Sequence, residues 1–333
     1  GEKTVIEYWH VNAETQGGLV VDELVKQFNE SNDHIEVVAK YNPDMYKGLM
    51  QNLQAEAATG NSPALVQIGW AFLDYFSNNF EYSSPQDVID QFDQEDKNFL
   101  QDNFLPNVLS LAVNSEGEQV GIPYSVSNPV LFINRDLLRE AGLSEDGPKT
   151  WEELDQFART VKEKTGKYGF YMQEPADFWA QQGLIESNNA SMLSTVDGKK
   201  QATFASEGGI QAIQMVADLI KDGAGLHISW EEGCQSFIDG NCAMLYTTIA
   251  RRSAVQKGSA FDVATVKSPT WGSNEEKCRP VDASLQLQRR MMNRRRQHGN
   301  LKSIYTALNP WQHGRSEPVM YRREKTSQMQ KTA

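Results

Sequence analysis

The sequence lacks the features of several large classes of protein. Among its 333 residues, no apolar run approaches the ~18–20 residues that a membrane-spanning helix needs. Its three cysteines form no CxxC or Cys/His spacing of the kind that binds zinc. Its five histidines are scattered, and it has no HExxH, GxSxG elbow, Walker loop or complete GxGxxG. We therefore expect no cofactor, no metal site and no catalytic residues.

The amino terminus also lacks a secretory leader, because no basic start is followed by an apolar stretch. The first residues run directly into a strand pattern, so we expect that a signal peptide is not present in this chain. A leader that had been removed would leave no trace here, and lipid anchoring of the mature protein stays open.

The charge is strongly negative but unevenly distributed. The net charge of -12 argues against nucleic acid as a partner. From Trp271 onwards, however, there are 13 Lys and Arg against 5 Asp and Glu, which leaves 19 against 39 in the first 270 residues. The chain thus joins two different compositions at about Trp271.

Strand and helix patterns alternate through the first 270 residues, which indicates an α/β protein. We predict strands near residues 5–9, 35–39, 64–70, 121–124, 129–134, 168–172, 242–247 and 261–266. A helix after Gly17 has the apolar face Val20, Leu24, Val25 and Phe28. We interpret the acidic residues 83–103 as a surface insertion.

One helix start is marked by a capping box. Thr150 and Glu153 have the required spacing at the beginning of a helix with an apolar face. Trp151 is predicted to be a core residue, and the neighbouring acidic residues suit a helix amino terminus. A second helix covers residues 206–221.

Several stretches, in order, resemble the family-1 extracellular solute-binding proteins of ABC importers, closest to the branch that binds glycerol-3-phosphate and sugars. The residues that carry the resemblance are Tyr8-Trp9-His10, Gly60-Asn61-Ser62-Pro63-Ala64, Gly121-Ile122-Pro123-Tyr124-Ser125, Pro129–Asp136, Pro148–Leu154 and Phe237–Met244. Each motif is weak alone, but their order and spacing over about 270 residues are specific.

The resemblance implies a periplasmic binding protein-like II fold, in which two α/β lobes are joined by a hinge and hold the ligand in a cleft. We expect residues 1–112 with 262–270 to form lobe 1 and residues 113–261 to form lobe 2. We expect residues 271–333 to be an out-of-frame tail, disordered or poorly packed, so that the fold is truncated at the carboxyl terminus.

The hypothesis for the tail is a frameshift near Gly272 to Asn274. Read two nucleotides on, with a choice of synonymous codons, Cys278 to Leu301 and Tyr305 to Tyr321 encode stretches similar to the family's carboxyl-terminal segments. Out-of-frame codons then account for the excess of Arg, Gln and Met. The alternative is a basic tail that binds anionic lipid or nucleic acid, but no amphipathic period or interleaved aromatic residue favours it.

The function that the resemblance implies is an extracytoplasmic receptor, in the periplasm or on the outer face of the membrane. It would be a monomer that binds a sugar, oligosaccharide or glycerol phosphate and delivers it to the permease subunits. Aromatic rings suit the apolar face of a sugar, and amides and hydroxyls suit its polar groups. Candidate ligand-binding residues at strand ends are Trp9, His10, Glu14, Trp70, Tyr124, Ser125, Ser127, Asn128, Trp179, Thr247 and Thr248.

For several candidates a structural role is as reasonable as a binding role. Trp9 has equal standing as a core aromatic, Glu14 could be solvated, and Ser127 with Asn128 could serve a turn. Arg251 and Arg252 could meet a phosphate, although surface arginines at a helix start are more common. The alternative function is a glycoside hydrolase, which needs two facing carboxylates, and Glu14 has no evident partner. A third possibility is an interaction protein without a ligand.

Overall fold

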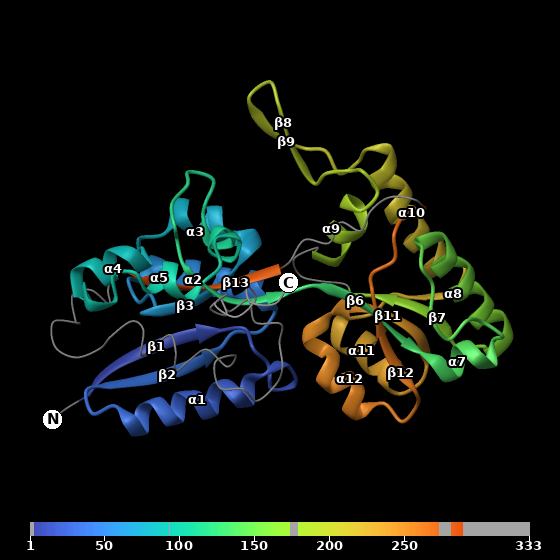
Figure 1. The fold of residues 1–333 in the computed structure, drawn as a ribbon, viewed down its shortest axis with the longest axis horizontal. Coiled ribbons are helices and arrows are strands. Elements are labelled where there is room, and N and C mark those ends of the chain that lie inside the picture. Colours follow the sequence, from blue (N-terminus) through green and yellow to red (C-terminus); the bar gives the residue numbers. More distant parts are fainter. Residues whose placement is uncertain (1–2, 93, 174–178, 273–280, 289–333) are drawn as a thin grey trace, which may run out of the picture. The chain divides into compact units, whose positions relative to one another are not determined.

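The computed structural model describes residues 3–92, 94–173 and 179–272 and the backbone of the strand 281–288. These residues form two compact units (Figure 1). Unit 1 takes in the residues up to Val126 together with the strand 281–288, and unit 2 takes in Ser127 to Gly272. Both are built from helices packed on a mixed sheet, so the predicted α/β class is confirmed.

Unit 1 contains the predicted β-α-β-α-β run. Its sheet has the order β2-β1-β3-β13-β4, with β5 paired to β13. The strands are β1 (Thr4–His10), β2 (Ile35–Tyr41), β3 (Leu65–Gly69), β4 (Tyr82–Ser83), β5 (Ile122–Ser127) and β13 (Val281–Gln288). Strand β1 is parallel to β2 and β3, whereas β13 is antiparallel to β3 and β4. The carboxyl ends of β1 and β3 therefore lie at the same edge of the sheet.

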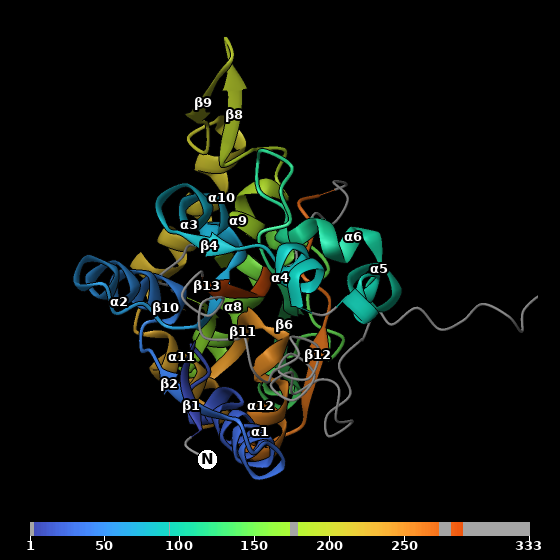
Figure 2. The ribbon, with the colours of Figure 1, turned by 90° about the vertical axis from the view of Figure 1, so that its left-hand side faces the viewer.

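Two long helices connect the parallel strands of unit 1, and shorter ones follow. Figures 1 and 2 place α1 beside β1 and β2, with α3 on the far side of these strands. The helices are η1 (Glu14–Gln16), α1 (Gly18–Ser31), α2 (Met45–Thr59), η2 (Trp70–Phe72), α3 (Leu73–Asn79), α4 (Pro85–Phe92), η3 (Gln94–Asp96), α5 (Phe99–Asn103), α6 (Pro106–Leu109) and η4 (Ser110–Ala112).

The buried face of α1 differs from the prediction by one residue. Val20 is 44% exposed, whereas Val21 is fully buried with Leu24, Val25 and Phe28. The two valines are adjacent and equally apolar, so only the rotation of the helix about its axis separates them. Gly17, with a φ of 88°, sets that start.

The interpretation of residues 83–103 as a polar surface insertion is wrong. This segment forms α4 and α5, which contribute Val88, Ile89, Phe99 and Leu100 to the core of unit 1. The helices are short, and each buries a pair of adjacent apolar residues. The many acidic residues between them concealed this pattern.

Unit 2 is built on a five-stranded sheet with the order β10-β7-β11-β6-β12. Its strands are β6 (Pro129–Asn134), β7 (Tyr168–Met172), β10 (Gly225–Leu226), β11 (Cys242–Thr248) and β12 (Val263–Val266). Strands β10, β7 and β11 are parallel, β6 is antiparallel to β11, and β12 is antiparallel to β6. The start of β6 therefore lies at the same edge as the carboxyl ends of β7 and β11.

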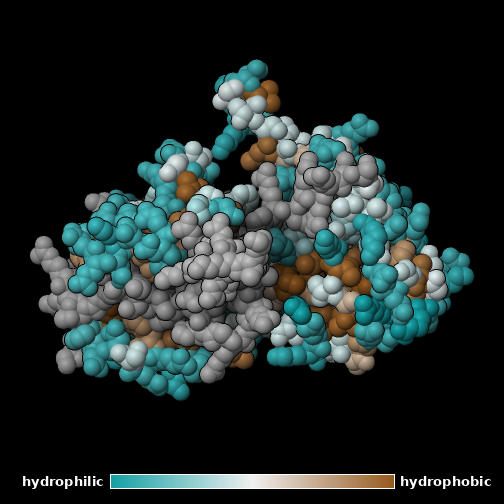
Figure 3. All heavy atoms as spheres, in the orientation of Figure 1, coloured by the Kyte–Doolittle hydropathy of each residue, from teal (hydrophilic) through white to brown (hydrophobic). Residues whose placement is uncertain are grey.

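The helices of unit 2 pack around this sheet, and a separate hairpin projects from it. The helices are α7 (Arg135–Glu140), α8 (Trp151–Thr165), α9 (Trp179–Glu186), α10 (Glu207–Lys221), α11 (Trp230–Ile238), η5 (Ile249–Arg251) and α12 (Arg252–Gly258). The hairpin of β8 (Leu193–Val196) and β9 (Lys199–Ala202) extends beyond α9 and α10 in Figures 1 and 2. In Figure 3 this hairpin carries apolar patches among hydrophilic residues, and Leu193 and Val196 are exposed.

The unit boundaries differ from the sequence-based lobes. Residues 262–270 were expected in lobe 1, but β12 pairs with β6 and extends the sheet of unit 2. Residues 113–126 were expected in lobe 2, but they belong to unit 1, in which β5 pairs with β13. Pairing partners decide these assignments, and a strand pattern alone does not identify its partner.

The described residues of the expected tail are part of the fold. Trp271 is 4% exposed in the core of unit 2, where its Nε1 donates to the carbonyl oxygen of Leu184 at 3.2 Å. Strand β13 then adds to the sheet of unit 1. The rest of the expected tail, residues 273–280 and 289–333, lies outside the described residues, so the frameshift stays a hypothesis.

The predicted helix cap at Thr150 is confirmed in part. Its hydroxyl oxygen accepts a hydrogen bond from the Glu153 amide at 3.1 Å. The Glu153 carboxylate reaches the amide of Lys149 at 2.6 Å instead of that of Thr150. Two hydrogen bonds thus stabilise the amino-terminal end of α8.

We expect Thr150→Ala to lower the free energy of unfolding by about 1 kcal/mol, because an amide of the first turn loses its acceptor. Urea denaturation at pH 7 measures this loss. Thr195→Ala, on the exposed hairpin, is the control and should change stability by less than about 0.5 kcal/mol. Equal stability of the two variants would show that the cap contributes nothing.

Candidate functional site

Three of the predicted residues lie at or just after the carboxyl ends of β1 and β3 in unit 1. His10 ends β1, Glu14 follows in η1, and Trp70 starts η2 directly after β3. Glu14 is exposed and Trp70 is half-buried. Parallel strands end at the same edge, so the order of the sheet brings these three residues to one edge. Their role in binding a ligand stays a prediction.

His10 is buried, with only 3% of its surface exposed. Its Nδ1 accepts a hydrogen bond from the Asn12 amide at 3.1 Å, which leaves the proton of the neutral ring on Nε2. Burial lowers the pKa of His10 to about 4, although nearby Asp22 acts in the opposite direction. The imidazole is therefore neutral at physiological pH and supports the turn after β1.

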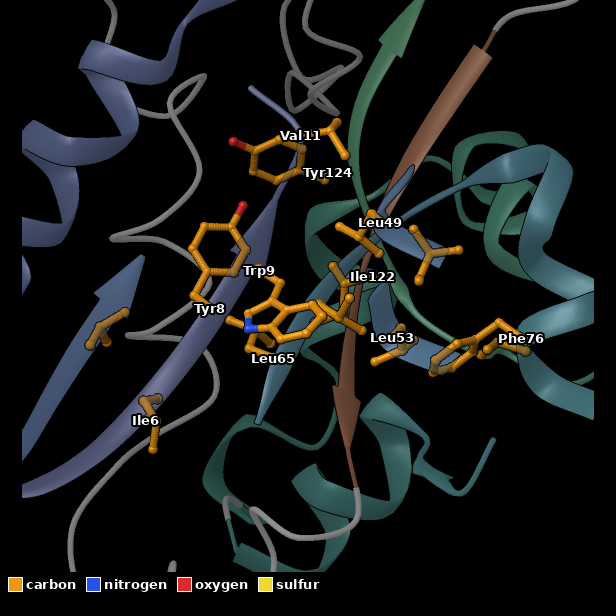
Figure 4. Packing of buried hydrophobic residues seen from close by; sticks show 14 of the residues in the cluster. Ile6, Tyr8, Trp9, Val11, Leu49, Leu53, Leu65, Phe76, Ile122 and Tyr124 are labelled. Carbon is orange, nitrogen blue, oxygen red and sulfur yellow. The ribbon is translucent and has the colours of Figure 1, made fainter. Parts of the chain in front are cut away.

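Trp9 is a core residue. Its side chain is 1% exposed and lies among Leu53, Leu65 and Ile122 (Figure 4). The Lys40 ammonium lies 4.8 Å from the ring centroid. The sequence left two interpretations of Trp9 open. The structure shows that Trp9 is a core aromatic residue, because both faces of the unit 1 sheet are covered.

Tyr124 is also buried, at 4% exposure, and Ser125 beside it is half-buried. The Tyr124 ring lies beside that of Tyr8 (Figure 4). Burial raises the pKa of Tyr124 to about 12, while Tyr8 and Asn12 act against this shift. The phenol therefore stays protonated and belongs to the interior of unit 1.

The sheet edge of unit 2 brings together four of the predicted residues. The register pairs Thr248, at the end of β11, with Pro129, at the start of β6. The hydroxyls of Ser127 and Thr248 share a hydrogen bond, and the Ile249 amide donates to the carbonyl of Asn128 at 3.0 Å. Ser127 is half-buried and Asn128 is exposed. The antiparallel pairing explains why residues 121 positions apart in the sequence meet.

Thr247 is at the centre of a chain of polar contacts. Its hydroxyl donates to Oε1 of Gln173 at 2.6 Å and accepts from Nε1 of Trp230 at 3.0 Å. Thr247 is fully buried and Gln173 is 6% exposed. Thr248 instead caps η5, because its hydroxyl accepts from the Ala250 amide at 3.1 Å. Both threonines are therefore already engaged, and Thr247 acts as a support for Gln173 and Trp230.

Arg251 is buried beside the hydrogen-bonded side chains of Gln173, Thr247 and Trp230, with 4% of its surface exposed. Its two Nη atoms bind the two carboxylate oxygens of Glu231, one of them at 3.1 Å. The guanidinium carbon lies 4.2 Å from the ring centroid of Trp230. Glu231 is 58% exposed, so the carboxylate of this ion pair lies at the surface of unit 2 while the guanidinium is buried. We call Gln173, Thr247, Trp230, Glu231 and Arg251 the Trp230 cluster.

Sequence reasoning missed most of the Trp230 cluster. For Arg251 the sequence left a phosphate contact and a surface position open, and Gln173, Trp230 and Glu231 were not predicted. A signal for Trp230 does exist, since Ser229 and Glu232 form a capping box that starts α11 at this residue. Gln173 directly follows a buried strand, where binding residues of α/β sheets are common.

Trp179 is half-buried at the start of α9. The predicted role of Trp179 in ligand binding stays a prediction. Cys234, beneath the cluster, has its thiol pKa raised to about 11 by burial, although Arg251 opposes this shift. Cys234 and Cys242 are both free and buried.

The Trp230 cluster combines several kinds of polar group. It contains a hydroxyl, an amide, an indole and a carboxylate, which are hydrogen-bonded or ion-paired within the cluster. In the described part of the chain, no group of three or more His, Cys, Asp or Glu could hold a metal ion. None of the described helices is both long and apolar enough to cross a membrane.

Comparison with protein families gives a match over most of the chain. Residues 23–286 match the model of the family described as bacterial extracellular solute-binding protein. The matched range includes all of unit 2 that the structure describes and most of unit 1.

Curated relatives share 27% identity over 282 residues. They include the sn-glycerol-3-phosphate-binding periplasmic protein UgpB of Escherichia coli K12 and that of Shigella dysenteriae. The alignment covers 80% of this chain and 61% of each relative, so the chain matches less than two thirds of their length.

Solved structures have the same fold at low sequence identity. The UgpB of Mycobacterium tuberculosis in complex with glycerophosphocholine gives a TM-score of 0.73 at 17% identity, covering 93% of this chain and 76% of that one. The acarbose receptor of Streptomyces glaucescens gives 0.72 at 18%, with the same coverage. A cycloalternan-bound ABC substrate-binding protein of Listeria monocytogenes gives 0.72 at 18%, covering 93% and 75%.

Proposed function

The chain belongs to the family of bacterial extracellular solute-binding proteins, and we propose that it is the receptor of an ABC importer for a small polar ligand. The ligand is a carbohydrate or a glycerol-phosphate compound. The receptor works outside the cytoplasm, in the periplasm or on the outer face of the membrane, and delivers its ligand to the permease.

The observation that carries this proposal is the Trp230 cluster at the edge of the unit 2 sheet. The half-exposed indole of Trp230 suits polyhydroxylated compounds, because an aromatic ring packs against C–H groups, and the buried Thr247 and Gln173 hold that indole in place. Binding sites of open α/β sheets lie at this kind of edge. The relatives are named for glycerol-3-phosphate, and the structural neighbours were solved with glycerophosphocholine, acarbose and cycloalternan.

We further propose that the protein binds without catalysis. A glycoside hydrolase needs one carboxylic acid and one carboxylate placed about 5–10 Å apart across the scissile bond. In the Trp230 cluster, Glu231 is held by both Nη atoms of Arg251, so it is not available to donate a proton. The matched family and relatives are named as binding proteins.

A thermal-shift screen of the full chain tests the proposal. We use sn-glycerol-3-phosphate, glycerophosphocholine, acarbose, maltose and cycloalternan, each at several concentrations. A ligand at 100 times its Kd should stabilise the protein by about 2.7 kcal/mol and raise the midpoint by a few degrees. Chromatography of the same mixtures should recover every sugar intact.

Thr247→Val is the informative variant, since it removes the hydroxyl that holds both Gln173 and Trp230. We expect it to reduce the ligand-induced shift, whereas Thr195→Val, on the exposed hairpin, should leave it unchanged. A screen in which no compound shifts the midpoint contradicts the proposal, and so does hydrolysis of a sugar by the purified chain.

A further inference from the structure

Strand β2 lies at one end of the unit 1 sheet, with α1 beside it (Figure 1). Among the strands that the structure describes, it pairs only with β1. The Thr4 amide donates to the carbonyl of His34, and the Asn42 amide donates to the carbonyl of His10. Backbone groups alternate in direction along a strand, so the even-numbered residues of β2 bond to β1 and the odd-numbered ones face outward. Such an outward row can pair with a strand of another chain.

Two asparagine side chains occupy part of this outward row. Nδ2 of Asn29, in α1, donates to the carbonyl of Val37 at 2.9 Å, and Oδ1 of Asn29 accepts from the Val37 amide at 2.7 Å. Oδ1 of Asn32 accepts from the Ile35 amide at 2.7 Å. A residue of a neighbouring antiparallel strand makes the same two bonds that Asn29 makes. The carboxamide of Asn29 therefore stands in the place of a further strand.

The exposed side chains of β2 are complementary to those of a second copy of the strand. Glu36, Val38 and Lys40 alternate along β2, and all three are exposed. In an antiparallel pair with its two-fold axis at Val38, each Glu36 faces Lys40 of the other copy, and the two Val38 side chains face each other. Opposite charges and apolar residues placed opposite each other stabilise strand pairs. Charge and pattern thus select one register and one partner.

We propose that β2 is a latent interface between two copies of this chain, and that Asn29 keeps it closed. In the register centred on Val38, Val37 exchanges both hydrogen bonds with Ala39 of the second copy. Asn29 competes for the same two atoms of Val37. The contact within the chain prevails because it does not carry the entropy cost of association. Without it, the two-fold symmetry of the register limits the assembly to a dimer.

Sedimentation velocity of the full chain tests this closure. The unmodified chain should be a monomer. Asn29→Ala should reach twice the monomer mass as its concentration rises, with a Kd of about 10–100 μM, because one strand pair is a small interface. Asn29→Ser, with a shorter side chain, should do the same. Asn79→Ala removes an exposed asparagine that donates within α3 and should stay monomeric. Circular dichroism shows that each variant is folded.

A second substitution in the Asn29→Ala background tests the register. Glu36→Lys places like charges opposite each other at both ends of the strand pair, so it should return the chain to a monomer. Glu140→Lys, at an exposed carboxylate at the end of α7, makes the same change in charge and should leave the dimer intact.

Cross-linking tests the position of the axis. The Cα atoms of residues facing each other at such a position lie about 4.5 Å apart, which a disulfide can span. Under mild oxidation, Val38→Cys should cross-link at least 10-fold faster in the Asn29→Ala background than in the otherwise unmodified chain. Val20→Cys, at an exposed position of α1, should not cross-link faster in that background.

Three results would overturn the proposal. The first is that a folded Asn29→Ala or Asn29→Ser chain stays monomeric at high concentration. The second is self-association that Glu36→Lys does not reverse, since another surface would then be responsible. The third is rapid cross-linking of Val38→Cys with Asn29 in place, because the edge would then already be open. This last measurement does not require the Asn29 variants to fold.

Discussion

Replacing Trp151 by Ala is expected to lower the free energy of unfolding by about 3–5 kcal/mol, the cost of removing a large aromatic side chain from a packed interior. Trp151 is 1% exposed. Its ring lies edge-on to Tyr246, with ring centroids 5.1 Å apart, and it also contacts Phe170 and Trp271 at 6.3 Å. The substitution therefore leaves a cavity between α8 and the centre of the unit 2 sheet.

Hydrogen exchange of the β7 and β11 amides, together with urea denaturation, measures this loss in the unit concerned. Trp151→Phe should cost less than Trp151→Ala, because the buried Nε1 has no hydrogen-bond partner among the described residues and the ring contacts are partly kept. Phe204→Ala, at an exposed position, is the control and should cost less than about 1 kcal/mol. A loss below about 1 kcal/mol for Trp151→Ala contradicts this account of the core.

Trp151 and Trp9 mark the limit of what the sequence could predict. Trp151 follows a capping residue and begins a helix with an apolar face, so its burial could be inferred from local signals alone. Trp9 ends the strand predicted for residues 5–9, and an aromatic residue next to a loop suits a core and a binding edge equally. Only the covering of both faces of the unit 1 sheet decided that it is buried.

Long-range pairing was harder to predict than element type. The strands at residues 129–134 and near 261–266 were both predicted. The second was assigned to the wrong unit, because the residues of a strand do not show which other strand it pairs with.

The burial of a charged side chain was equally hard to predict. Arg251 has the sequence neighbours of a surface arginine, and its burial depends on Glu231 and Trp230, about 20 residues away.

The stability of unit 1 is expected to fall as the pH is lowered from about 6.5 towards 4, and His10 is the cause. The pKa of His10 is about 4 in the folded protein and about 6.5 in an unfolded chain. Between these values the unfolded chain takes up a proton that the folded protein does not, so protonation favours unfolding. The contribution of His10 is complete above about pH 7. Its loss approaches about 3 kcal/mol at the acid end, at 1.36 kcal/mol per pKa unit.

Urea denaturation at pH 7, 6, 5 and 4.5, followed by exchange of the β1 amides, measures this dependence. Other groups also titrate below pH 5, so the informative quantity is the difference between two variants. His10→Asn keeps an oxygen that can accept from the Asn12 amide but removes the titrating group, and it should flatten the curve between pH 6.5 and 4.5. Thr195→Asn, at an exposed position that carries no titrating group, should leave the slope unchanged. Equal slopes in the two variants would mean that His10 is protonated as easily in the folded protein as in the unfolded chain. The burial of the imidazole after β1 would then have no energetic consequence for unit 1.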